Sequence, residues 1–91
     1  MGVKLEIFYP RLKQLLGNTD ALELEGRSVG ECLKDLVKRF PGAEELLFDE
    51  RGALLRQVFV YVNAESAYKV ALDTPVKDGD RLIIATLAIG G

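Results

Sequence analysis

The sequence contains no histidine and no tryptophan, and its 91 residues include a single cysteine, Cys32. Without histidine, the chain cannot use imidazole as a general base or as a metal ligand. One cysteine excludes an intrachain disulfide and any C-x-x-C site. A self-sufficient enzyme built from this chain would depend on carboxylates, lysines, tyrosines or Cys32. We therefore expect no metal site in the chain.

Basic residues form no cluster, because 12 Lys and Arg are spread along the chain among 14 Asp and Glu, for a formal net charge of −2. This distribution argues against a nucleic-acid partner. No apolar run approaches the roughly 20 residues that span a bilayer, and the start, "MGVKLEIFYP", alternates like a strand and unlike a signal peptide. Hydrophobic residues make up 48% of the chain, enough to bury a core. The sequence thus predicts one domain over residues 1–91, cytoplasmic and without a membrane partner.

Apolar residues alternate with polar ones at 3–8 and 21–25, which predicts strands with one buried face. Two further segments, 57–63 and 81–85, are apolar runs rich in β-branched and aromatic residues and also predict strands, with Val58, Val60 and Val62 on one face and Leu82 and Ile84 directed inward. We expect the stretch 9–18 between the first two strands to be a loop, since Pro10 ends a strand and Gly17-Asn18 favours a turn. Residues 67–76 are irregular or form a short edge strand, limited by Pro75. Gly79, between two aspartates, predicts a tight turn before the last strand.

The strongest helix signal begins at Ser28. Ser28 and Glu31 form an S-x-x-E capping box. Apolar residues then recur at helical spacing until Pro41-Gly42 ends the helix; they are Val29, Cys32, Leu33, Leu36, Val37 and Phe40. The segment 43–48 favours a short second helix. The element order predicts an α+β roll, a mixed sheet of four to five strands packed on one main helix, in which a right-handed crossover places the strand after the helix parallel to an earlier strand. This is the β-grasp, or ubiquitin-like, architecture.

The face of the sheet opposite the helix is predicted to carry large apolar side chains, which would mark a partner-docking surface. These residues are Phe8, Phe59, Tyr61 and Ile83. The alternative is that the loop around 46–55 folds over them. Cys32 lies in the apolar stripe of the helix, where burial would raise the pKa of its thiol, so we interpret it as a core residue. Turn chemistry likewise explains Asp78 and Asp80 without a site.

The sequence closes on Gly90-Gly91, directly after an apolar strand. We interpret residues 86–91 as an extended tail, in which two glycines let the backbone enter a narrow cleft. A carboxylate at Gly91 is ionised at neutral pH and is a poor electrophile, so it reacts only after activation, most simply as an acyl-adenylate made by another enzyme. Leu87 and Ile89 are the apolar residues of the tail that would contact such a partner.

Five segments of the chain resemble the MoaD/ThiS family of sulfur carriers in the β-grasp superfamily. "FYPRLKQLLG" is similar to the family segment F-x-A-x-L-R-E-L-x-G, with Pro10 in place of alanine, and "SVGECLKDLVKRFPG" is similar to the family's helix. "VYVN" and "DGDRLIIA" match its V-x-V-N strand and D-G-D-x-V turn, and Gly90-Gly91 matches its terminal diglycine. The tail departs from the P-P-V-S-G-G of molybdopterin-synthase carriers, and 60–65 is closer to carriers that serve a cysteine synthase.

The resemblance implies a protein co-substrate and not an enzyme. An ATP-dependent activating enzyme would adenylate Gly91, and a sulfur donor would convert it to a thiocarboxylate. The acceptor would be a molybdopterin synthase large subunit, a cysteine synthase or an enzyme of the thiamine pathway. No cofactor would bind the chain, because the partner uses the ATP. Two alternatives stay open: a ubiquitin-like modifier joined through Gly91 to target lysines, and a non-conjugating β-grasp interaction domain.

Overall fold

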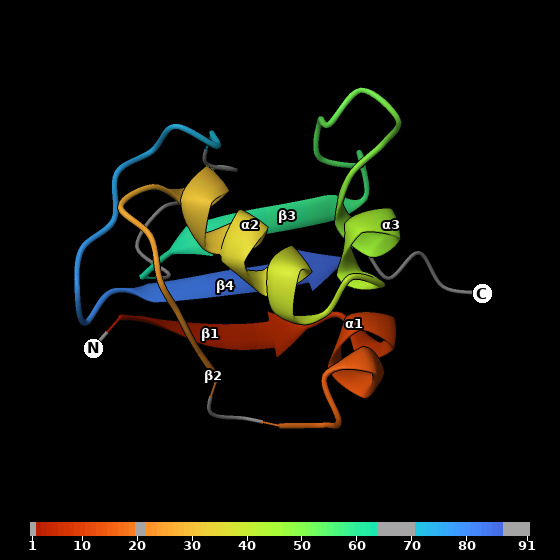
Figure 1. Cartoon of the computed structure of the whole chain (residues 1–91), viewed down its shortest axis with the longest axis horizontal. Coiled ribbons are helices and arrows are strands. Elements are labelled where there is room, and N and C mark those ends of the chain that lie inside the picture. The colour runs from red at the N-terminus through yellow and green to blue at the C-terminus, as the bar shows by residue number, and fades with distance from the viewer. Residues whose placement is uncertain (1, 20–21, 64–70, 87–91) are drawn as a thin grey trace.

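The computed structural model describes residues 2–19, 22–63 and 71–86, which form a mixed four-stranded sheet and three helices (Figure 1). The strands are β1 (Val3–Phe8), β2 (Leu22–Leu24), β3 (Val58–Val62) and β4 (Arg81–Thr86), and the helices are α1 (Pro10–Leu15), α2 (Val29–Arg39) and α3 (Ala43–Leu47). The sheet has the order β2-β1-β4-β3, and α2 crosses one of its faces. This is the predicted β-grasp, ubiquitin-like roll.

The last strand, β4, lies in the centre of the sheet. It pairs in parallel with β1 and antiparallel with β3, so that Ile84 lies between Ile7 and Val60. The strand after the main helix, β3, runs parallel to β2, the strand before it, as predicted, although the two lie at opposite edges of the sheet and do not pair. The composition of β4 explains its place. Leu82, Ile83 and Ile84 are consecutive and all buried, which suits a strand with neighbours on both sides.

The predicted loop between β1 and β2 contains a helix, α1, which the sequence analysis missed. Pro10 occupies the first helical turn, where its fixed φ suits a helix and its missing N–H costs no hydrogen bond. Leu12 and Leu16 are buried beneath α1. The Tyr9 hydroxyl before it donates a hydrogen bond to the carbonyl oxygen of Leu46 (2.9 Å). Six residues are too few to show a helical period, so Pro10 suggested a break and not a start.

The main helix, α2, begins at the predicted capping residue. The Ser28 hydroxyl accepts a hydrogen bond from the N–H of Glu31 (3.1 Å), and the Glu31 carboxylate accepts one from the N–H of Arg27 (3.0 Å). The N–H of Gly30 donates to the carbonyl oxygen of Leu72 (2.7 Å). A Cβ at position 30 would lie 3.1 Å from that oxygen. Because the backbone at Leu72 comes so close to the helix, glycine is favoured at position 30. The helix start is therefore fully used for folding.

The hydrophobic core lies between α2 and the facing side of the sheet. Its members come from every helix and strand; they are Val3, Leu5, Tyr9, Leu12, Leu16, Leu24, Val29, Cys32, Leu33, Leu36, Ala43, Leu47, Val58, Val60, Val76, Leu82 and Ile84. The segment around 46–55 belongs to this side as well, since Leu47 is a core residue and Phe48, Leu54 and Leu55 pack against the core. It is therefore not the cover of the opposite face that we considered as an alternative.

The two motif residues Asn63 and Asp80 tie β3 to the turn before β4. The Asn63 amide donates to the Asp80 carboxylate (3.1 Å), and its oxygen accepts from the N–H of Arg81 (2.8 Å). Asn63 adopts a positive φ of 60° and Gly79 one of 89°, conformations that asparagine and glycine tolerate best. These contacts give the "VYVN" and "DGD" segments a structural explanation.

Between residues 71 and 80 the structure contains no strand, and Pro75 forms only an isolated bridge with Ser28. The rest of the proposed fifth strand, 67–70, lies outside the described residues. None of the helices in 2–19, 22–63 and 71–86 combines the length and apolar character that crossing a bilayer requires.

Candidate functional site

We call the sheet face opposite α2 the outer face. The strand register places its side chains in rows that run across neighbouring strands. The row nearest the end of β4 is apolar, because Ala85 lies between Phe8 of β1 and Phe59 of β3. The next row places Ile83 between Glu6 and Tyr61. Thus the apolar end of the outer face is the end at which the chain leaves the sheet towards residues 87–91.

The row at the opposite end of the outer face is charged. Lys4 of β1 lies between Glu23 of β2 and Arg81 of β4. The Arg81 guanidinium also lies 3.7 Å from the carboxylate of Glu6 in the neighbouring row. Because both side chains are substantially solvent-exposed, this pair adds little stability, and its main effect is to make this end of the face polar.

The four predicted docking residues differ in how far they are exposed. Phe8 is 62% exposed, which is unusual for a side chain of that size. Phe59 and Tyr61 are half-buried. Ile83 is only 7% exposed, so our expectation that it is offered to a partner needs correction. It does lie outside the core cluster, and it is covered because β4 is flanked on both sides.

A hollow of about 440 Å³ adjoins Phe8 at the end of β4. It is lined by β1, by α1 and by Thr86; from α1 and its flanks come Tyr9, Pro10, Lys13, Gln14 and Asn18. Among the described residues that line it, Lys13 is the one that carries a charge. Helix α1, which the sequence analysis missed, therefore forms one wall beside the point where the tail begins. The signal that could have revealed it was Pro10 followed by the spacing of Leu12 and Leu16.

Thr86, which we had assigned to the tail, belongs to the sheet. Thr86 is the last residue of β4 and pairs with Val58. The other tail residues to which we assigned roles are Leu87, Ile89, Gly90 and Gly91, and they lie outside the described residues. Their roles, like those of the docking residues, stay predictions.

The side chains of the described residues offer little reactive chemistry. Cys32 is fully buried, and desolvation, with the nearby Asp35, Glu31 and Glu25 carboxylates, raises the pKa of its thiol to about 11. It is therefore a neutral core residue, as predicted, and not a nucleophile. In contrast, the hydrogen bond from Asn63 and that from the N–H of Lys77 lower the pKa of Asp80, so its carboxylate is ionised and serves the turn. Within 2–19, 22–63 and 71–86, no three Cys, Asp or Glu side chains are placed to hold a metal ion.

The family of the chain follows from a family model. The model of the ThiS family matches residues 7–91, nearly the entire length and including Gly90-Gly91. The chain belongs to the ThiS family, which confirms the resemblance seen in the sequence.

Solved structures agree with this assignment. A chain in the crystal structure of the Amycolatopsis orientalis BexX/CysO complex is 32% identical, with a TM-score of 0.83 and coverage of 99% of this chain and 100% of that one. SAMP1 from Haloferax volcanii is 27% identical, with a TM-score of 0.78 and 98% coverage of both chains. CysO from Mycobacterium tuberculosis is 28% identical, with a TM-score of 0.80, covering 93% of this chain and 98% of that one. Among curated protein sequences no match was found. The family and these neighbours support a small ubiquitin-like sulfur carrier.

Proposed function

We propose that this protein carries sulfur as a thiocarboxylate on Gly91. The carboxylate oxygen of Gly91 attacks the α-phosphorus of ATP on an activating enzyme, and pyrophosphate leaves. A sulfide equivalent from a sulfur donor then attacks the acyl carbon of the adenylate, and AMP leaves. The observation that carries the proposal is that the ThiS family model extends through the diglycine to residue 91.

The arrangement of the outer face supports a protein partner. Phe8 is 62% exposed and lies in the same row as Ala85, next to the last residue of β4. Large exposed aromatic residues are typical anchors of protein interfaces. A partner that binds this row would lie beside the start of the tail and would hold Gly91 near its own active site. Phe59 and Tyr61 would widen the contact, and Leu87 and Ile89 would bind inside the partner's cleft.

The acceptor of the sulfur is proposed from the neighbours. Two of the similar structures carry the name CysO, and one of them is a complex with BexX. The similarity of residues 60–65 to carriers that serve a cysteine synthase supports an acceptor of that kind, or another biosynthetic enzyme that takes up sulfide, over a molybdopterin synthase. The tail sequence agrees, because Thr86 and the residues after it depart from the molybdopterin-carrier ending.

A second function is favoured by a specific observation. SAMP1 from Haloferax volcanii is named a small archaeal modifier protein, and it shares the fold over 98% of both chains. Conjugation to a target lysine would start from the same adenylate, since the lysine amine would attack the acyl carbon in place of sulfide. We therefore propose a modifier role as the alternative fate of activated Gly91.

Intact-mass measurement of the protein isolated from its own cells tests both functions. The carrier function predicts an oxygen-to-sulfur mass shift confined to the C-terminal peptide, and deletion of Gly91 abolishes it. An unmodified carboxylate together with lysine-linked adducts of other proteins would favour the modifier. A chain that shows neither species under any growth condition would contradict both.

A further inference from the structure

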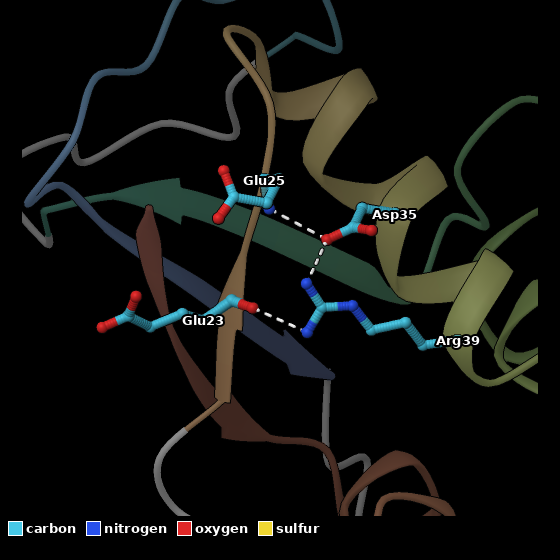
Figure 2. A network of polar contacts seen from close by, with 4 residues as sticks. All are labelled: Glu23, Glu25, Asp35 and Arg39. Atoms are coloured by element: carbon cyan, nitrogen blue, oxygen red, sulfur yellow. Dashed lines mark hydrogen bonds and ion pairs between the residues drawn. The ribbon is translucent and has the colours of Figure 1, made fainter. Parts of the chain in front are cut away.

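Side chains of α2 bond to two backbone groups at the edge strand β2, the C=O of Glu23 and the N–H of Glu25 (Figure 2). All three β2 residues have partners on β1, and Glu23 lies opposite Lys4. In an antiparallel ladder the N–H and C=O groups of every second residue point away from the partner strand, and the bonds from α2 show that Glu23 and Glu25 are these residues. Unpaired N–H and C=O groups at a sheet edge are a template for pairing with another chain. Side chains that bond to these edge groups therefore disfavour pairing with the edge of another chain.

Two side chains one helical turn apart on α2 each bond to one of these groups. Arg39 Nη1 donates to the carbonyl oxygen of Glu23 (2.9 Å), and the N–H of Glu25 donates to Asp35 Oδ2 (2.9 Å). The same Asp35 oxygen lies 2.9 Å from Arg39 Nη2, so the two side chains also hold each other in place. Figure 2 shows these contacts as one continuous network between α2 and β2.

The spacing of the two side chains matches the spacing of the strand. Residues i and i+4 on a helix have Cβ atoms about 5–6 Å apart, and two residues of a strand span about 6.6 Å. A carboxylate at position 35 and a guanidinium at position 39 thus offer one acceptor and one donor where a neighbouring strand would offer a C=O and an N–H. The pair acts as a substitute for the missing strand.

We propose that Asp35 and Arg39 form a side-chain lock that keeps a second copy of this chain from pairing with the β2 edge. The negative charges beside Leu24 also oppose such pairing. In an antiparallel β2–β2 pair centred on Leu24, Glu23 of one copy lies opposite Glu25 of the other, and like charges directly opposite are destabilising. Bonds from α2 thus occupy two groups of the edge, and like charges oppose pairing there. We expect that both obstacles must be removed before two sheets join.

Four variants separate these two obstacles. The lock is opened by Asp35→Ala with Arg39→Ala, which leaves the net charge at −2. The edge is neutralised by Glu23→Gln with Glu25→Gln, which brings the net charge from −2 to 0. The third variant combines all four substitutions. The fourth is a control that combines the open lock with Glu44→Gln and Glu45→Gln on α3, so that the net charge is also 0 but the β2 edge keeps its carboxylates.

Sedimentation equilibrium over a concentration series measures the association. We expect the third variant to double its average mass as concentration rises, and the other three to stay monomeric like the wild type. A third variant that stays monomeric would contradict the proposal. So would equal association of the fourth variant, because net charge and not the edge would then be the cause, or equal association of the second variant, because the lock would then be irrelevant.

Amide hydrogen exchange distinguishes local opening of the β2 edge from unfolding of a variant. The Glu25 N–H should exchange at least tenfold faster once the lock is open, while the N–H of Phe40, which bonds to Leu36 within the same helix, should be unchanged. In the associated third variant the Glu25 N–H should become protected again. Uniformly fast exchange would indicate unfolding. The milder pair Asp35→Ala with Arg39→Met, which keeps a long unbranched side chain at position 39, then replaces the two alanines in the neutral-edge background. Failure of that pair to associate overturns the proposal.

Discussion

The two faces of the sheet come from the same strands and differ sharply in what they contact. On the α2 side, neighbouring core residues such as Val60, Leu82 and Ile84 are fully buried. On the outer face, Phe8 is 62% exposed, and charged side chains occupy the far rows. Because successive strand residues point to opposite faces, one strand supplies both environments. The difference indicates that the α2 side determines stability, and we propose that the outer face serves recognition.

The sharpest test of this comparison uses two adjacent isoleucines on β4. Ile84→Ala should lower the free energy of unfolding by about 2–5 kcal/mol, because it leaves an enclosed cavity in the core. Ile83→Ala should cost about 1–2 kcal/mol, because its site lies on the outer face and solvent can reach the gap. Chemical denaturation measures both. Equal losses would mean that the outer face is as much a core as the α2 side.

Cys32 tests whether the α2 side tolerates a polar atom. Cys32→Ser should cost about 1–3 kcal/mol, since a buried hydroxyl without a partner loses its hydration. The matched Cys32→Ala should cost about 1 kcal/mol, the order of one buried methylene. Thiol labelling of the wild type at neutral pH should be slow until the protein unfolds. Rapid labelling of the native protein, or a serine variant as stable as the wild type, would contradict our placement of Cys32.

The turn beside the charged end of the outer face should show the smallest effect, and it depends on pH. The hydrogen bonds from Asn63 and the N–H of Lys77 lower the pKa of Asp80 from its usual 3.8. Its stabilising contribution is therefore present above the unfolded pKa and is lost as the pH falls through the lower folded value. Unfolding curves of the wild type and Asp80→Asn should differ at neutral pH and converge in acid. A constant difference down to the lowest pH would rule out this role.

The sequence predicted the parts of the fold that repeat. The alternation in β1, the apolar runs of β3 and β4 and the stripe of α2 each extend over several residues, so a local pattern was enough. The capping pair Ser28 and Glu31 was also correctly placed, because its contacts are local.

The missed features depend on contacts between distant segments. Helix α1 is too short for a period, and its stability comes from burying Leu12 and from the Tyr9 contact with Leu46. The burial of Ile83 follows from the central position of β4, which no local pattern reveals. The lock between β2 and α2 could not be predicted either, since Asp35 and Arg39 looked like ordinary exposed helix charges. The residues of the predicted docking surface could be identified from the sequence, because the alternation of strand residues between the two faces is local. How far each of them is exposed could not be predicted, because that depends on the neighbouring strands.

The central claim is that the apolar end of the outer face recruits the enzyme that modifies Gly91, and one measurement tests it directly. Phe8→Asp should leave the free energy of unfolding within about 0.5 kcal/mol of the wild type, as for an exposed site. In the source cells, the fraction of this variant that carries a C-terminal thiocarboxylate should fall at least tenfold, because an aromatic anchor contributes about 2 kcal/mol or more to binding. Lys38→Ala, on the exposed side of α2, is the control and should match the wild type. A folded Phe8→Asp variant with a wild-type level of thiocarboxylate would contradict the account.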